Sequence, residues 1–444
     1  MNEQQIWKII RQRDFSISDS DVDVATEIFL DDVNHENYNF NNYTREIFTQ
    51  QGKKRAVYSY PRLSCEDILC QYLKRQLDNS FQIRYASRNK IMNILFNILP
   101  AVKDMNDFVI IRADFKSFFD SVLTEHVYSK YIQESLMSRA DKEILEQYVA
   151  AFDYCYAGLC LSNGMTEIVC RDFDERIKAK LAKVGVFFYE RYVDDLLIIT
   201  NRYISKHDFG ELINNTIGEV FGKCQVKLST SPGKFSYITR RNLSAISSFN
   251  FLGYDFQMEE VLKTRNNKSW KEIQFKYGIA EKKRRKYRGI IENAFIQYKK
   301  NNDIELLRQR IKIYSSRVVI ARTIGSSSFD WLTKGVVSNY NELRYHMDCL
   351  LSDTNNFMKN LYFDLLRQYG CQIPYFLKQA TTEPSIYCIY SNMSRNRTIM
   401  FEKNIGVSET TIIKWINKID PTYNAFGKDY YRIVVDYLDL IKVE

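Results

Sequence analysis

The sequence predicts an α+β fold up to about residue 264 and a mostly helical part after it. Apolar, β-branched runs typical of strands occur at 108–111 (FVII) and 186–200 (VFFYERYVDDLLIIT). Amphipathic helical patterns surround them. From residue 265 onward, charged and apolar residues recur mainly at helical spacing, as in 281–300. We therefore expect two regions of different architecture.

Length and composition predict several closely joined units. A chain of 444 residues exceeds one ordinary small domain, and its hydrophobic fraction of 45% is ample for a core. Only 6 Pro and 16 Gly are present, and no flexible linker stands out. We place an N-terminal extension at 1–50, the α+β core at 51–264, a basic helical segment at 265–329 and an α-helical domain at 330–444.

Composition also argues against several classes of site. Nine cysteines without a CxxC pair favour reduced thiols in a cytoplasmic protein over disulfides or zinc, and four histidines leave little material for imidazole chemistry. The start, MNEQQIWKIIRQRD, lacks the apolar run of a signal peptide, and no run of about 18 apolar residues exists, so we expect no membrane partner. The net charge of +9 suits a polyanion without identifying one.

Strand and helix patterns predict the order of elements along the chain. Before the hairpin we expect a basic strand, a turn at Pro61 and an amphipathic helix within 53–78, a helix over 87–99 ended by Pro100, a strand at 108–111 turning into a helix by 122, and helices within 137–183. After it we expect a helix near 208–222, a short strand at 224–229, an aromatic strand at 249–257, and helices over 281–300 and 305–322.

Three aspartates follow or join the expected strands. Asp114 comes directly after a buried strand, and Asp194 and Asp195 lie near the tip of the hairpin. Two strands of one sheet would bring them to one edge, where carboxylates suit two Mg²⁺ ions, with Mn²⁺ as the alternative. Two such metals activate a 3′-hydroxyl and stabilise departing pyrophosphate. The other interpretation is an ordinary turn and a helix cap.

Five motifs in order resemble those of reverse transcriptases over roughly residues 45–260. They are KKRAVYSYP, the basic fingers strand; ADFKSFFD and RYVDD, the two aspartate motifs; SPGKF, the lysine motif; and FLGYDF, the primer grip. The resemblance implies a right-hand polymerase with a fingers–palm core, a helical thumb over 265–329 and an α-helical C-terminal domain. The implied activity is RNA-directed DNA synthesis.

The resemblance also implies roles for single residues. The catalytic and metal-binding triad would be Asp114, Asp194 and Asp195, with Asp194 the firmer ligand. The dNTP would contact Lys54, Arg55, Phe115, Phe119 and Lys234. Phe119, with Phe118 as the rival, would exclude a 2′-hydroxyl, and Lys234 would give a proton or charge to pyrophosphate unless it is an ordinary loop lysine.

A basic segment, EKKRRKYRG at 281–289, falls where a thumb helix would follow the nucleic-acid backbone. The alternative is a solvated helix face. We expect Arg310, Lys312 and Arg317 to extend this surface. The expected nucleic-acid contacts are Gly158, Tyr192, Gly253, Tyr254, Lys282, Lys283, Arg284, Arg285, Lys286 and Arg288.

One motif departs from the family pattern. In AGLCLSNGMTEIVCRDFDERI (157–177), Cys160 and Leu161 stand where Pro and Gln are usual. This erosion resembles bacterial abortive-infection and other defence-associated reverse transcriptases, which act against phage. The resemblance implies a noncoding RNA template or nascent DNA, and a second reverse transcriptase or other defence protein in a homo- or hetero-oligomer. Template-independent or protein-primed synthesis, and a non-catalytic RNA-binding or assembly role, are the alternatives.

A final stretch, NIGVSETTIIKWINK at 404–418, resembles the turn and second helix of a helix-turn-helix. Ser408 is the expected cap of that helix, with Thr411 in the box position. The alternative is an ordinary capped amphipathic helix.

Overall fold

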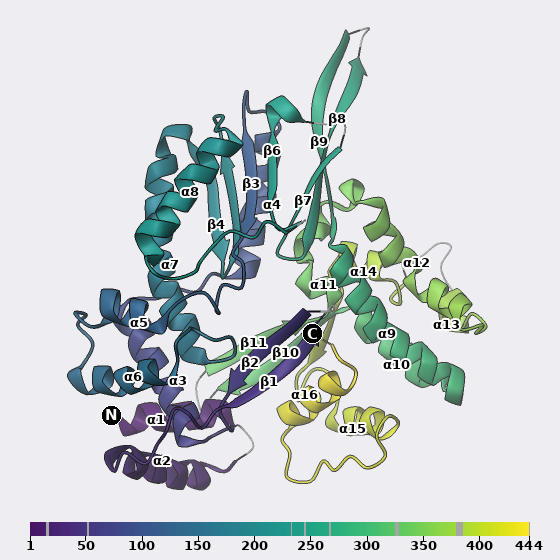
Figure 1. Ribbon diagram of the computed structural model, residues 1–444. Helices are drawn as coiled ribbons and strands as arrows, with labels where there is room; N and C mark the ends of the chain where they lie inside the picture. The colour runs from purple at the N-terminus through teal and green to yellow at the C-terminus, as the bar shows by residue number, and fades with distance from the viewer. Residues whose placement is uncertain are drawn as a thin grey trace. The chain divides into compact units, whose positions relative to one another are not determined.

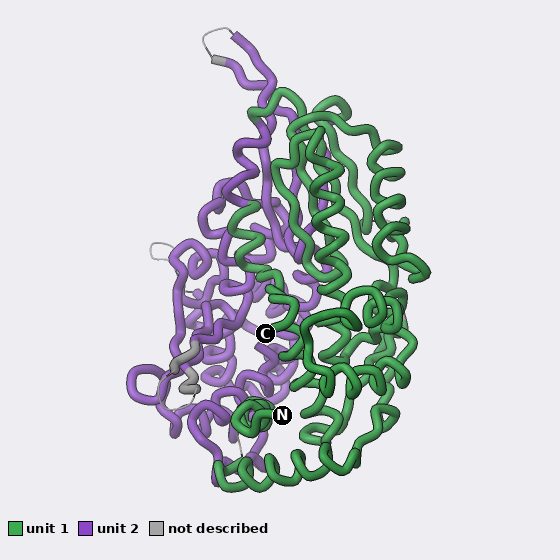
Figure 2. The backbone as a smooth tube through the Cα atoms, turned by 90° about the vertical axis from the view of Figure 1, so that its left-hand side faces the viewer, with its two compact units in different colours: residues 1–95, 104–242 green, residues 96–103, 243–444 purple. Residues whose placement is uncertain are grey.

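The computed structural model describes residues 1–14, 17–50, 53–231, 233–243, 246–265, 268–324, 328–378 and 385–443. The chain forms two compact units, shown in different colours in Figure 2. Unit 1 comprises residues 1–95 and 104–242, and unit 2 comprises 96–103 and 243–444. Both units mix helices and strands, so the fold is mixed α/β.

An antiparallel sheet of four strands organises unit 1. Its order is β4-β5-β3-β6, formed by Val186–Tyr192, Asp195–Thr200, Val109–Asp114 and Ser236–Thr239. All six residues of β3 are buried, as its apolar run predicts. Helices α7 (Cys160–Leu181) and α8 (Lys206–Phe221) pack against each other beside this sheet (Figure 1). The β4–β5 hairpin expected from the sequence is confirmed.

The N-terminal residues belong to the same unit. Ile6 and Ile10 of α1 are fully buried, and α1 packs against α2 and α3. β1 and β2 form an antiparallel pair. The remaining elements of unit 1 are α1 (Glu3–Arg13), α2 (Asp19–Asn34), β1 (Thr44–Gln50), β2 (Lys53–Ser59), α3 (Cys65–Ser80), α5 (Thr124–Val127), η1 (Tyr128–Ile132), α6 (Arg139–Ala151), η2 (Ala182–Val184) and η3 (Arg240–Asn242). α4 (Arg88–Val102) runs from unit 1 into unit 2.

The described residues of unit 2 form two three-stranded sheets and a set of helices. Strands β7 (Ile246–Phe251), β8 (Tyr254–Arg265) and β9 (Lys268–Ile279) form one sheet. In the second, β10 (Arg317–Ile324) lies between β11 (Ser328–Lys334) and β12 (Thr398–Phe401), and pairs parallel with β12. The helices are α9 (Glu281–Asn301), α10 (Ile304–Tyr314), α11 (Val336–Asn339), η4 (Asn341–Tyr345), η5 (Met347–Cys349), α12 (Ser352–Gln368), α13 (Tyr375–Lys378), α14 (Ile389–Arg395), α15 (Glu409–Asn417) and α16 (Tyr430–Leu440).

The expectation that the chain is mostly helical from residue 265 onward is wrong in part. The helix expected over 305–322 ends at Tyr314, and β10 follows. Its consecutive Val318, Val319 and Ile320 are β-branched residues that prefer strands. Strands β9 and β10 lie in the expected helical thumb, β11 crosses its boundary at residue 329, and β12 lies in the expected helical domain.

The structure also differs from the expected elements at three places. Pro100 lies inside α4 instead of ending it. The expected strand at 224–229 reduces to one bridge, between Phe115 and Leu228. Residues 116–122 form turns, and the next helix begins at Thr124. Unit 1 ends at residue 242, inside the stretch 51–264 that is expected to form the core. None of the described helices combines the length and apolar character needed to span a bilayer.

Candidate active site

The sheet register brings the two aspartate motifs together. β3 and β5 are antiparallel, with Asp114 directly opposite Asp195. The β4–β5 turn consists of Val193 and Asp194 between the paired Tyr192 and Asp195. Val193 has φ 59°, an unusual conformation for a β-branched residue. The amide of Phe115 donates to the carbonyl oxygen of Asp194 at 3.1 Å, which ties the turn to the end of β3.

Two cations hold the carboxylates at this sheet edge. Arg112 and Asp114 share one face of β3, because side chains alternate along a strand. Arg112 Nη2 lies 2.6 Å from Asp195 Oδ1 and 3.5 Å from Asp114 Oδ2. Arg112 Nη1 also donates to the carbonyl oxygen of Gly233 at 2.7 Å. Lys234 forms an ion pair with Asp114. The lysine motif and the first aspartate motif are therefore joined, 120 residues apart.

The pKa values of the hairpin aspartates reflect crowding of negative charge. Burial, followed by the charge of Asp114, raises the pKa of Asp194, while Lys234 and Arg55 oppose the rise. Burial raises the pKa of Asp195 to about 6. Arg112 opposes that rise, and the charges of Asp114 and Asp194 add to it. The carboxylates are thus close enough to repel one another, and additional positive charge would stabilise their ionised forms.

The donor set fits a divalent cation. Carboxylate oxygens are the hard ligands that Mg²⁺ and Mn²⁺ prefer. Asp194 is half-buried and has no ion-pair partner in the part of the chain that the structure describes. Asp114 and Asp195 instead pair with Lys234 and Arg112. Asp194 therefore offers the carboxylate that a metal ion can bind without displacing a cation.

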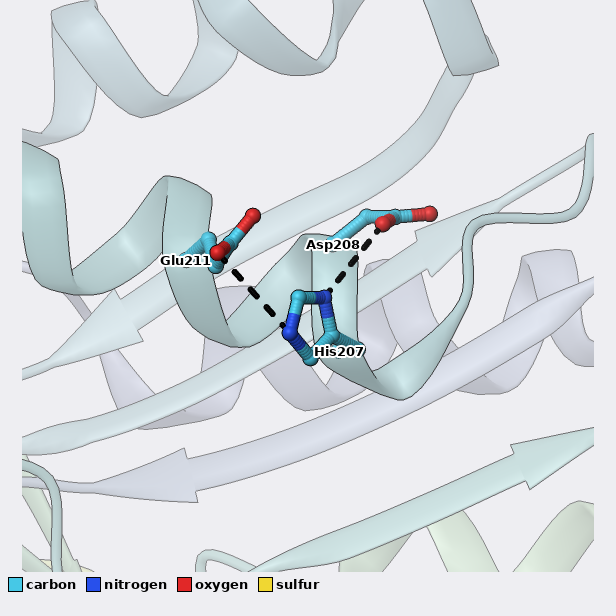
Figure 3. A group of neighbouring side chains, drawn as sticks. All are labelled: His207, Asp208 and Glu211. Carbon is cyan, nitrogen blue, oxygen red and sulfur yellow. Dashed lines mark ion pairs between the residues drawn. The ribbon is translucent and has the colours of Figure 1, made fainter.

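A different group meets a simple distance test for metal binding. Among the described residues, only His207, Asp208 and Glu211 place three ligand atoms within 4.8 Å of one another. Figure 3 shows them on the first turns of α8. All three are exposed, and the ring nitrogens of His207 lie 3.7 Å from Asp208 and 3.8 Å from Glu211. These are ordinary surface ion pairs near a helix N-terminus, where acidic side chains are favoured.

The residues expected to bind dNTP fall into different environments. Arg55, exposed on β2, acts electrostatically on Asp194. Lys54 is also exposed, but it directly precedes Arg55 in β2. Because side chains alternate along a strand, Lys54 points to the opposite face of β2 from Arg55. Phe119 is half-buried and keeps an accessible surface.

The expectation that Phe115 contacts dNTP is corrected. Its side chain is 2% exposed and stacks on Phe118, with ring centroids 5.1 Å apart. Phe173 and Phe221 complete this aromatic cluster in the core of unit 1. Phe115 therefore packs in the core next to the end of β3, and Phe118 is likewise a core residue at 3% exposure.

Gly158 has a packing role that explains its identity. It has φ +103°, and a Cβ there would overlap the carbonyl oxygen of Tyr58 and lie 2.6 Å from Val57 Cγ1. The amide of Tyr58 donates to the carbonyl oxygen of Ala157 at 2.9 Å. Only glycine permits this approach of the segment before α7 to β2. Gly158 is nevertheless exposed, so its expected contact with nucleic acid stays a prediction.

Sequence reasoning missed Arg191, which anchors the hairpin to α7. Its guanidinium, 5% exposed, bonds to Glu167 at 2.7 and 3.0 Å and to Asp174 at 3.1 Å. It also donates to the carbonyl oxygen of Val193 at 2.9 Å, in the turn beside Asp194. Two features of the sequence point to this contact. Arg191 lies inside a mainly apolar hairpin, and Glu167 and Asp174 are seven residues apart, on one face of α7. Arg112, also missed, is the one charge inside the run VIIRA.

The remaining expected nucleic-acid contacts lie in unit 2, apart from Tyr192, which is half-buried beside Asp195. Tyr254 is a correction: its ring is fully buried, and its hydroxyl donates to the Glu342 carboxylate and, at 3.2 Å, to the Asn339 carbonyl. Gly253 (φ +86°) forms the tight β7–β8 turn, where the positive φ favours glycine.

The basic face of α9 is narrower than expected. Lys282, Lys283, Arg285 and Lys286 are exposed. Arg284 instead donates to the carbonyl oxygen of Ile279 at 2.6 Å, and Arg288 donates to Gln368 at 2.6 Å. Arg310, expected to extend the surface, is 5% exposed. Helical periodicity turns these three side chains toward the protein.

Comparison with known proteins gives limited information. No family model matches the chain. One similar solved structure is apo telomerase from Candida tropicalis truncated from its C-terminal domain, with a TM-score of 0.34 and 13% identity. The match covers 52% of this chain and 55% of the telomerase chain, so the chain spans about half the length of that protein. A similarity of this size assigns neither fold family nor function.

Proposed function

We propose that the chain is a DNA polymerase of the reverse-transcriptase type, with a right-hand arrangement and Mg²⁺-dependent synthesis from dNTPs. The observation that carries this proposal is the pairing of Asp114 with Asp195 across β3 and β5, beside Asp194 in the hairpin turn. Lys234 and Arg55 act on the same carboxylates. The motif order in the sequence supports the same interpretation.

The residues divide the chemical tasks among them. Asp114, Asp194 and Asp195 would hold the metal ions, which when bound polarise the attacking hydroxyl and neutralise charge on the phosphates. Arg55 supplies positive charge beside Asp194, where a triphosphate would need it. Lys234 is paired with Asp114, so it lies close enough to give a phosphate oxygen a charge or a proton. The accessible side of Phe119 suits contact with the sugar.

The proposal also includes a biological role, in defence of a bacterium against phage. Resemblance to the bacterial defence group supports an anti-phage role, with a dedicated noncoding RNA as template and nascent DNA as product. It also supports a second reverse transcriptase or another defence protein as a partner. The exposed cations of α9 suit sequence-independent contact with a phosphate backbone.

A second candidate is template-independent or protein-primed synthesis. In the eroded motif, Leu161 is fully buried and Cys160 is half-buried at the start of α7. An apolar, buried side chain offers no hydrogen bond to a template at the position where the family has a polar residue. A non-catalytic RNA-binding role is the third candidate, and it gives no reason to crowd three carboxylates at one sheet edge.

The test is nucleotide incorporation by the purified chain together with its co-purifying nucleic acid. Labelled dNTPs and Mg²⁺ are added, and any product is sequenced. Asp194→Asn should abolish incorporation, whereas Asp208→Asn, a matched change at an exposed carboxylate of α8, should leave it intact. Loss in the Asp208 variant and retention in the Asp194 variant would move the metal site to α8.

The sequence and attachment of the product distinguish the three candidate functions. A copy of a bound RNA supports templated synthesis, and a random or homopolymeric tract made without RNA supports the second candidate. Product attached to a protein residue identifies protein priming. Normal RNA binding with no product under any condition, including co-expression with neighbouring genes and phage infection, leaves the non-catalytic role.

A further inference from the structure

A cavity of about 460 Å³ lies within unit 2, whereas the three aspartates belong to unit 1. Its walls come from α10, α15, strand β12 and the residues before α14. Ligand pockets in proteins typically measure roughly 300–1,000 Å³. This cavity is therefore large enough for one nucleotide-sized molecule, and too small for a duplex.

Positive charge dominates the wall of this cavity. Arg308 and Lys312 come from successive turns of α10, and Lys414 from α15 together with Lys418 just beyond its end; Glu305 is the single acidic residue. Arg308 pairs with Glu305 at 2.6 Å, and Lys418 pairs with Asp303 at 2.8 Å. Lys312 and Lys414 are exposed and have no ion-pair partner within the described ranges. The cavity therefore offers two uncompensated ammonium groups to an anion.

Aromatic and apolar side chains form the rest of the lining. Trp415 and Tyr387 are half-buried, and Leu306 and Ile313 are almost fully buried. Trp415 packs against Tyr437, with ring centroids 5.6 Å apart, and its indole N–H makes no hydrogen bond to any residue that the structure describes. An aromatic wall beside free cations suits a base attached to a phosphate, since bases stack on aromatic rings.

Helix α15, which resembles the second helix of a helix-turn-helix, forms part of the wall of this cavity. Thr411, Lys414, Trp415 and Lys418 recur at three- and four-residue steps, so they share one helix face, and this face lines the cavity opposite α10. A recognition helix needs such a face free to enter the major groove. Ser408 begins α15 as expected, but its hydroxyl contacts the Thr411 hydroxyl at 2.7 Å and does not cap a backbone amide.

We propose that this cavity binds one unpaired nucleotide. The base packs against Trp415 and Tyr387, and the phosphate lies between Lys312 and Lys414. A free nucleotide and an unpaired nucleotide of a single strand share this chemistry. The site is independent of the polymerase proposal, because every residue that carries it lies in unit 2.

Photo-crosslinking of the full chain locates binding directly. The probes are 8-azido-dATP and a (dT)8 strand carrying one 4-thiothymidine, each without added metal, and crosslinked peptides are identified by mass spectrometry. We expect labelling of the peptides that contain Tyr387 or Trp415. This labelling should persist in Asp194→Asn, so failure of the polymerase proposal would not affect it. Labelling by the strand alone identifies single-stranded nucleic acid, and labelling by both probes identifies a site for free nucleotide as well.

Variants test the two halves of the site. Lys312→Gln with Lys414→Gln should weaken labelling about tenfold or more, because two charge-assisted contacts are lost. Trp415→Leu should also reduce it, while Trp415→Phe, which keeps a ring in the same packing, should retain most of it. Lys403→Gln, at an exposed lysine outside the lining, is the matched control.

Three results would overturn the proposal. One is the absence of labelling at both peptides with both probes. The second is labelling unchanged by loss of the two lysines in a variant with wild-type circular dichroism. The third is competition by duplex DNA or an acidic peptide as strong as competition by the single strand, which would assign the cavity to another partner.

Discussion

The guanidinium of Arg112 on β3 lies 2.6 Å from the carboxylate of Asp195 on β5, and both side chains are largely buried. A buried ion pair of this kind orients its members, and removal of one member leaves the other uncompensated. Arg112 also reaches Asp114, so a single cation organises two of the three carboxylates. It is a positioning residue, since the aspartates and not Arg112 face the proposed chemistry.

Arg112→Met should lower the free energy of unfolding by about 3–5 kcal/mol, because two carboxylates lose their buried cation. Urea denaturation measures this loss. Adding Asp195→Asn should restore part of the stability, since the amide carries no charge. Strictly additive effects of the two changes would show that the pair is not coupled.

Asp195 should make stability depend on pH in metal-free buffer. Its folded pKa of about 6 exceeds the ordinary value of 3.8, so the folded state binds the proton more tightly. The resulting stabilisation is complete below about pH 4 and is lost as pH rises through 6. With a shift of about two units, the loss is at most about 3 kcal/mol.

Thermal melts of the wild type and Asp195→Asn in EDTA, from pH 4.5 to 7.5, check this dependence. The Tm of the variant relative to wild type should rise across that range. A constant difference would mean that Asp195 keeps an ordinary pKa.

Magnesium should stabilise the folded chain through Asp194. At pH 7.5 the wild type should gain Tm on addition of millimolar Mg²⁺, because binding to the folded state alone shifts the equilibrium. Asp194→Asn should lose most of this gain, and Asp208→Asn should keep it. Equal gains in all three proteins would place the metal elsewhere.

Gly158→Ala should destabilise unit 1 by several kcal/mol, since the new methyl group overlaps the backbone of Tyr58 at a positive φ. Gly210→Ala is the matched control. Gly210 lies within α8 with nothing within 4 Å of its Cβ position, so alanine should stabilise by about 0.5–1 kcal/mol. Chemical denaturation compares the two, and equal effects would contradict the close packing.

Tyr254→Phe distinguishes a core role from a primer contact. Loss of the hydroxyl leaves the buried Glu342 carboxylate without its donor, which should cost roughly 1–3 kcal/mol of stability. Tyr345→Phe, at a side chain 64% exposed, should change stability little. Affinity for a primer–template should be unchanged per folded molecule in both variants. A drop in that affinity at unchanged Tm would restore the primer-grip role.

Local patterns in the sequence were sufficient for the elements that frame the aspartates. The apolar, strand-forming runs on both sides of Asp194 and Asp195 predicted the β4–β5 hairpin, and the buried run before Asp114 predicted β3. They were insufficient for residues 317–324, where an amphipathic helical spacing and a β-branched run overlap. Pairing with β11 and with β12, some eighty residues later, selected the strand.

By itself, the sequence determined where carboxylates, cations and aromatic residues stand relative to strand ends and turns, because short-range periodicity and turn chemistry specify local structure. Tertiary structure decided which of them meet. The β3–β5 register placed Asp114 opposite Asp195, and packing turned Phe115 and Tyr254 into core residues. Partners such as Arg112 with Asp195, or Arg191 with α7, depend on pairing and burial between distant segments, which no local pattern specifies.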